Sequence, residues 1–262
     1  MFVPASDLAG TTTAQASGRL FRDVGSRNRM QMRSKCRTQM RSCVALCVGH
    51  DYQIPRWHKG SELLYNICEE SFDTPGTAAL VAVAMTEAIS MWGDIQVSFR
   101  LVSRSDPAAF QIKFKEANSS HPDLYAKSFL PGECNGRLVV YQNALDESAC
   151  LASILAHEVG HILGLRHEFA LERERQWPSV RFGRKNHLSI MNYFDHPREL
   201  HVSKQDRDEL AAFYAYDGAH YRGLPVIDVR PDLSKIDKCR VRRQPGRLFL
   251  RKQLLRFGVR IN

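Results

Sequence analysis

Two histidines and a glutamate in the middle of the chain have the spacing of a metal site. The segment 157–168 reads HEVGHILGLRHE and follows an apolar run, 149–155, that we expect to form the first turns of a buried helix. Residues four apart lie on one face of a helix, so His157 and His161 project the same way, with Glu158 one position further round. Two imidazoles at this spacing can both reach one tetrahedral metal ion, and the carboxylate stays available as a base.

Two further features extend this pattern. Gly164 follows His161 by three residues, and a glycine leaves right-handed helical geometry at no steric cost, so the chain can turn back and offer His167 as a third nitrogen ligand. Met191 stands further along in the short apolar segment SIMNY. The alternative, a surface helix whose charges are merely solvated, leaves these additional features unexplained.

The pattern H-E-x-x-H-x-x-G-x-x-H followed by a methionine turn resembles that of the metzincin zinc endopeptidases. Glu168, directly after the third histidine, and Tyr193, two residues after Met191, are similar to the astacin branch. The segment 124–132, LYAKSFLPG, is instead similar to the matrixin strand and loop above the cleft. The likeness is specific over about 124–193, and it fits the whole class better than either branch.

The resemblance implies a zinc-dependent metalloendopeptidase that hydrolyses internal peptide bonds of proteins. It implies one zinc ion per chain, with three ligands: His157, His161 and His167. Glu158 would take the proton of a zinc-bound water and deliver it to the leaving amine. Tyr193 would be an extra zinc ligand at rest, and would hydrogen-bond the tetrahedral intermediate once substrate is bound.

The remaining residues of the pattern are expected to support the site. Met191 would form an apolar floor beneath the histidines, Gly164 would make the turn, and Glu168 would make a buried hydrogen bond that fixes the end of the site. Lys127 and Val139 stand where a matrixin would carry ligands of a second, structural zinc, so we expect no second metal.

The elements around these residues predict an α+β fold. Alternating apolar residues predict strands over 56–67, 95–101 and 110–114, and a short apolar run predicts a buried strand over 138–141. By resemblance, 125–130 would be the edge strand along the cleft. Helical spacing predicts helices over 74–92, with Pro75 in the first turn, and over 204–214, with Ser203 as the cap. The resemblance adds the arrangement: a twisted, mixed, mostly parallel five-stranded sheet with an antiparallel edge strand, an active-site helix and two further helices.

Two segments near the third histidine carry more specific expectations. The stretch 169–188 is polar, and we interpret it as a surface excursion. By resemblance, residues 194–197 would form one wall of the pocket for the residue that follows the cut bond.

Charge divides the 262 residues, of net charge +9, into three parts. We expect a basic, disordered or propeptide-like extension over 1–52, a catalytic domain over 53–229, and a basic tail over 230–262. An acidic body between two basic ends is not typical of nucleic-acid binding. No apolar run is long enough for a membrane span. We therefore expect no nucleic acid and no transmembrane segment. The resemblance implies a polypeptide substrate, and we expect a monomer.

The basic ends and the cysteines leave alternatives open. The seven cysteines are an odd count; one disulfide among Cys68, Cys134 and Cys150 and buried free thiols are equally compatible with the sequence. Cys43 or Cys47 capping the metal in a latent form is the less favoured alternative to a simple tail. No secretory signal is evident, although the resemblance favours secretion. The alternative function is a catalytically inactive metzincin-fold binding module with basic tails.

Overall fold

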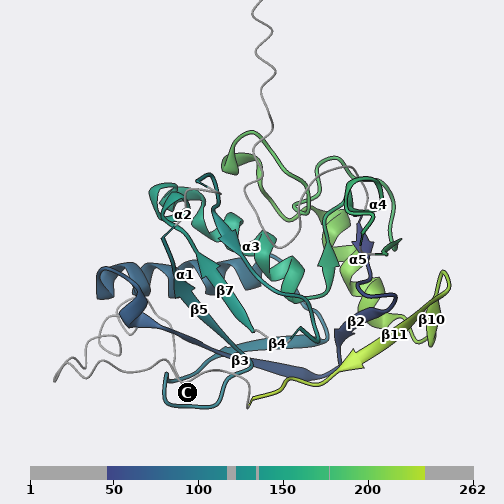
Figure 1. The fold of residues 1–262 in the computed structure, drawn as a ribbon, viewed down its shortest axis with the longest axis horizontal. Helices are drawn as coiled ribbons and strands as arrows, with labels where there is room; N and C mark the ends of the chain where they lie inside the picture. Colours follow the sequence, from purple (N-terminus) through teal and green to yellow (C-terminus); the bar gives the residue numbers. More distant parts are fainter. Residues whose placement is uncertain (1–45, 117–121, 134–135, 177, 234–262) are drawn as a thin grey trace, which may run out of the picture. The chain divides into compact units, whose positions relative to one another are not determined.

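A computed structural model describes residues 46–116, 122–133, 136–176 and 178–233. Its largest sheet has five strands in the order β4-β3-β5-β7-β6 (Figure 1). The strands are β3 (Ser61–Ile67), β4 (Val97–Leu101), β5 (Phe110–Phe114), β6 (Ala126–Lys127) and β7 (Arg137–Val140). All neighbours pair in parallel except β6, which runs antiparallel to β7 at the edge. The predicted α+β fold with a mostly parallel five-stranded sheet is confirmed.

Three long helices accompany the sheet: α1 (Pro75–Ser90), α3 (Leu151–Ile162) and α5 (Lys204–Ala215). Thr74 caps α1 by accepting a hydrogen bond from the amide of Thr77, and Pro75 occupies the first turn. Ser203 and Asp206 form a reciprocal capping box at the start of α5. The helices α1 and α3 pack against each other beside the sheet, and α5 lies beside β2 (Figure 1).

Short elements complete the described chain. They are β1 (Cys47–Val48), β2 (Ile54–Trp57), η1 (Glu69–Ser71), α2 (Gln142–Asp146), η2 (Ser148–Cys150), β8 (Leu165–Arg166), α4 (Ala170–Arg173), β9 (Val180–Arg181), η3 (Pro197–Glu199), β10 (His220–Tyr221) and β11 (Leu224–Val229). None of the helices in the described ranges has the length and apolar character needed to cross a membrane.

The single first strand expected over 56–67 is divided in two. The strand β2 pairs in parallel with β11, whereas β3 enters the five-stranded sheet. The break falls at Gly60, which adopts φ +79°, a conformation that a glycine accepts without steric cost. Residues 58–62, HKGSE, interrupt the apolar alternation, and the prediction of one continuous strand passed over this signal.

The packed body extends further toward the N-terminus than the boundary expected at residue 53. Leu46, Cys47 and Val48 are fully buried, and β1 pairs antiparallel with both β8 and β9. Three of the cysteines, Cys47, Cys68 and Cys150, are buried. Cys47 and Cys150 are free thiols. Cys134, Cys43 and the basic stretches 1–45 and 234–262 lie outside the described residues.

Candidate metal centre

The helix α3 is held at its C-terminal end by side chains from distant parts of the chain. The indole of Trp57 donates to the carbonyl of Ile162 at 2.7 Å, and the hydroxyl of Tyr214 donates to the carbonyl of Leu163 at 3.1 Å. The last carbonyls of a helix have no intrahelical partner, so these bonds satisfy groups that would otherwise be unpaired in the core. The helix that carries the first two histidines is therefore fixed in position.

The turn after α3 requires its glycine. Gly164 has φ +95°, and a Cβ at this position would lie 2.9 Å from the carbonyl oxygen of Pro55. The chain reverses here into β8, which leads directly to His167. The structure thus places Gly164 at the turn between the second and third histidines.

The three histidines come together in the core. His157, His161 and His167 each offer one ring nitrogen, and these nitrogens all lie within 4.8 Å of one another. Each ring also has its Nδ1 against an oxygen: the carbonyl of Ile190 for His157 at 2.7 Å, the carbonyl of Leu165 for His161 at 2.8 Å, and Oε1 of Glu174 for His167 at 2.8 Å. We assign the ring proton to Nδ1 in all three, which leaves each Nε2 with a lone pair.

These lone pairs fit a cation. The Nε2 atoms of His161 and His167 are 3.2 Å apart, and two acceptors at this distance repel each other. No described residue hydrogen-bonds to the buried Nε2 of His157. Burial and the neighbouring histidine rings hold the pKa values of His161 and His167 well below the usual range, so both rings are neutral, the form that binds a metal. The geometry is that of a three-nitrogen zinc site.

Glu158 lies beside this group in a buried setting. The hydroxyl of Ser128 donates to Oε2 of Glu158 at 2.7 Å, and it also lies 3.1 Å from the backbone carbonyl of the same residue. Ser128 follows the edge strand β6, so the strand along the cleft and the active-site helix are joined at the carboxylate. Glu158 is not among the metal-ligating atoms of the three-histidine group.

The turn 189–193 passes beneath the histidines and is held by α5. Asp206 is buried and accepts from the hydroxyl of Ser189 and, at 3.1 Å, from the amide of Ile190. The carbonyl of Ile190 in turn receives the Nδ1 proton of His157. Met191 is fully buried and packs against Gly160 of α3. The helix α5 thereby fixes the position of the turn relative to the metal site.

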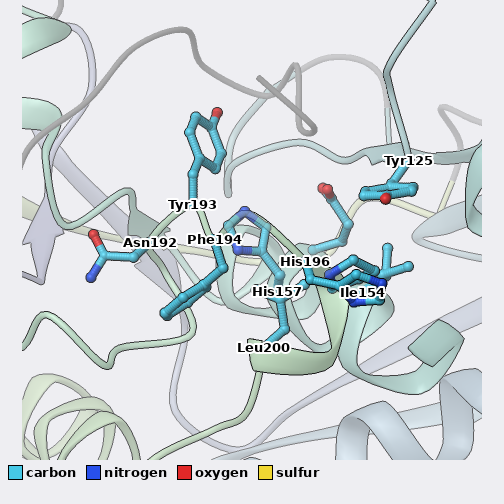
Figure 2. A pocket seen from close by; sticks show the side chains of 10 residues that line it. Tyr125, Ile154, His157, Asn192, Tyr193, Phe194, His196 and Leu200 are labelled. Atoms are coloured by element: carbon cyan, nitrogen blue, oxygen red, sulfur yellow. The ribbon is translucent and has the colours of Figure 1, made fainter. Parts of the chain in front are cut away.

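Tyr193 stands next to the histidines. Its ring centroid is 4.7 Å from that of His167 and 6.3 Å from that of His157. In the view of Figure 2 its hydroxyl points away from the imidazole of His157. The position is close enough for a role in the reaction, and the assignment of Tyr193 as an extra zinc ligand stays a prediction.

A pocket opens beside the metal group (Figure 2). His157, Glu158 and Tyr193 line it together with Tyr125, Ile154, Asn192, Phe194, His196, Pro197 and Leu200. The segment 194–197 thus contributes three residues to its wall, and Ile154 and Leu200 add apolar side chains. Such a pocket can take up an apolar side chain.

Glu168 is buried at the end of the site. Its Oε2 accepts from the amide of Asn186 at 3.4 Å, and no described residue hydrogen-bonds to its Oε1. Burial raises the pKa of Glu168 to about 8. Its own amide donates to the carbonyl of Met191 at 3.1 Å, which ties the residue after the third ligand to the turn below it.

Cys47 and Lys127 are placed away from metal-ligating roles. The thiol of Cys47 donates to the backbone carbonyl of Glu168 at 3.7 Å, and burial raises its pKa to about 12. The alternative in which Cys47 caps the metal is therefore wrong for this structure. Lys127 is exposed on β6, and His157, His161 and His167 are the one metal-ligating group among the described residues.

The interpretation of 169–188 as a surface excursion is wrong in one important respect. Glu174 and Arg166 are both fully buried and form an ion pair, with 2.7 Å between Nη2 and Oε2. Burial raises the pKa of Glu174 to about 7, although Arg166 acts in the opposite direction. Sequence reasoning missed Glu174, because a polar segment ordinarily indicates solvent exposure. It also missed Arg166, which lies before that segment, because charged side chains are seldom buried.

Three other supporting residues were missed: Ser128, Gly160 and Asp206. Only Asp206 had a readable signal, since a serine three residues before an aspartate is typical of a capping box. That signal indicates the helix end and says nothing of the contact to the turn 189–193.

Comparisons with known proteins find one family model that covers the three histidines. Residues 56–173 match the family model described as Matrixin. A structure of myroilysin is 15% identical, with a TM-score of 0.45, and the alignment covers 65% of this chain and 99% of that chain. High choriolytic enzyme 1, a hatching enzyme zinc-protease from the medaka fish Oryzias latipes, is 21% identical, with a TM-score of 0.28, and covers 43% of this chain and 50% of that chain. A search of curated proteins finds no match.

The matched residues contain the edge strand, the active-site helix and all three histidines. Together with the converging imidazoles, the match identifies a metzincin-type zinc metalloprotease domain. Proteins of this class use zinc, and the three-histidine group is positioned to bind it.

Proposed function

We propose that this chain is an active endopeptidase that cleaves internal peptide bonds of polypeptides. The observation that carries the proposal is the position of Glu158, a buried carboxylate that lines the same pocket as His157 and is held by Ser128. A zinc site with a purely structural role has no use for a carboxylate placed beside it and opening onto a pocket.

Each residue of the site has a defined task in this proposal. His157, His161 and His167 hold the zinc. When bound there, the zinc would lower the pKa of a water from about 15.7 toward about 7 and would polarise the peptide carbonyl. Glu158 accepts the proton of the attacking water and passes it to the leaving amine. Tyr193 donates a hydrogen bond to the oxyanion.

The lining of the pocket supports a preference for substrates with an apolar residue after the cut bond. Ile154, Leu200, Pro197 and Phe194 give it an apolar lining, so we propose that it takes an apolar side chain from the residue that follows the cut bond. Polypeptides with apolar residues at that position would be cleaved in preference to those with charged ones.

The test uses the full chain and its Glu158→Gln variant. Zinc content is measured by metal analysis, and cleavage of a denatured protein is followed with and without a zinc chelator. We expect one zinc per chain, cleavage that stops with the chelator and returns with zinc, and a variant that keeps zinc but loses at least about 10²-fold in activity. A zinc-loaded wild type that cleaves no polypeptide would instead support the inactive binding module.

A further inference from the structure

His167 differs from the other two histidines in what orients it. The Nδ1 atoms of His157 and His161 donate to backbone carbonyls, those of Ile190 and Leu165. The Nδ1 of His167 donates to a side chain, Oε1 of Glu174, at 2.8 Å. A backbone acceptor is present whatever the side chain is, whereas the orientation of His167 depends on one particular glutamate.

Glu174 is in turn held by a buried cation. Neither Glu174 nor Arg166 has any exposed side-chain surface, and Nη2 of Arg166 donates to Oε2 of Glu174 at 2.7 Å. The two carboxylate oxygens are thus shared between Arg166 and His167. A buried carboxylate without a compensating charge is unfavourable, so Arg166 allows Glu174 to remain an acceptor beside the third histidine.

Arg166 reaches beyond the matched family segment. Its Nη1 donates to the backbone carbonyl of Gly49 at 3.1 Å, and the strand that carries Arg166, β8, pairs with β1 at Cys47–Val48. Gly49 has φ +113°, and a Cβ there would lie 3.3 Å from both the carbonyl oxygen of Pro178 and Cα of Ser179. A residue other than glycine at position 49 would therefore shift the backbone carbonyl that accepts from Arg166.

We propose that Glu174 is the positioning residue for His167 and that Arg166 and the buried segment 46–49 hold it in place, as an outer layer of the metal site. The inference rests on the proposed function only in that His167 is a zinc ligand. It assigns the segment 46–49 to the metal site, although the charge pattern grouped this segment with the basic extension expected over 1–52.

Zinc affinity of the full chain, measured by competition with a chromogenic chelator, tests the proposal. Glu174→Gln removes the ion pair, and the double variant Arg166→Leu/Glu174→Leu removes both charges together. Replacing a whole buried ion pair by apolar residues is often tolerated, so the double variant keeps the test valid if the single variant does not fold. Glu172→Gln, on the exposed side of the short helix α4 that directly precedes Glu174, is the matched control.

We expect zinc binding to weaken by about 10–100-fold in the Glu174 variants and to stay unchanged in Glu172→Gln. The absorption bands of the cobalt-substituted protein should also shift in the double variant, because the third ligand is no longer held at one angle. A folded double variant with wild-type zinc affinity and an unaltered cobalt spectrum would overturn the role of Glu174.

A pair of glycine variants tests the role of the segment 46–49 in zinc binding. Gly49→Ala should weaken zinc binding, whereas Gly60→Ala, also at positive φ but with no described atom within 4 Å of its Cβ, should not. Equal zinc affinity in these two variants would overturn the role of 46–49. A wild-type chain that binds no zinc would contradict the proposed function, and that outcome differs from loss of affinity in the variants alone.

Discussion

Gly160 and Met191 are packed so closely that residue 160 has no room for a Cβ. A Cβ built there would overlap Sδ of Met191 and would lie 2.9 Å from Cζ2 of Trp92. The close approach of the helix to the turn below the metal site therefore depends on the missing side chain of Gly160 as well as on Met191.

Gly160→Ala is expected to lower the free energy of unfolding by up to about 2 kcal/mol. Overpacking of a core costs about 1–3 kcal/mol, and the better helix propensity of alanine returns about 1 kcal/mol. Urea denaturation measures the change. Gly76→Ala in the first turn of α1 is the matched control: its Cβ would meet only Oγ1 of Thr74, at 3.6 Å, so this variant should be as stable as the wild type or more so. A stabilised Gly160→Ala protein would contradict the tight contact.

Ser128→Ala is expected to lower kcat by roughly 10–10²-fold with little change in KM or zinc affinity. The hydroxyl holds Oε2 of Glu158, and a hydrogen bond to a charged group is worth about 1.5–3 kcal/mol. Steady-state kinetics on one good peptide measure the effect, with Ser90→Ala on the exposed face of α1 as the control. An unaltered kcat would mean that the carboxylate is held adequately without the serine.

Tyr193→Phe separates a catalytic phenol from a pocket wall. If the hydroxyl stabilises the oxyanion, its loss should lower kcat by roughly 10²–10³-fold with little change in KM. Zinc affinity should fall only slightly, because the three imidazoles remain. A change confined to KM or to side-chain preference would assign Tyr193 to the pocket that it lines.

Cys47 is expected to resist alkylation in the folded protein at pH 8. Burial raises its pKa to about 12, so only about one molecule in 10⁴ carries the reactive thiolate at that pH. Peptide mapping after iodoacetamide treatment, with and without urea, measures the difference. Rapid labelling of the native chain would show that β1 is not packed as described.

The raised pKa of Cys47 also determines how the stability of the fold changes with pH. The thiol ionises near pH 9 in the unfolded chain and near pH 12 in the folded one. Between these values the unfolded state has lost the proton that the folded state keeps, so the contribution of Cys47 to stability is present below about pH 9 and is lost as the pH rises toward 12. Replacing Cys47 by alanine should flatten this part of the profile.

The sequence by itself determined the parts of the site that follow from local geometry. The spacing of His157 and His161 places them on one face of any helix, and Gly164 permits the turn that brings His167 back. Thr74 with Pro75, and Ser203, mark helix starts through contacts within one turn. Such features are readable because each depends on residues only a few positions apart.

Only the tertiary structure decided which side chains support the ligands. Ser128 reaches Glu158 across 30 positions, and Asp206 holds Ile190 across 16. The polar composition around Glu174 indicated solvent, yet its carboxylate is buried because Arg166 and His167 meet it there. A polar residue can be buried when its partners are present, and those partners are brought together by packing of elements that the local sequence does not encode.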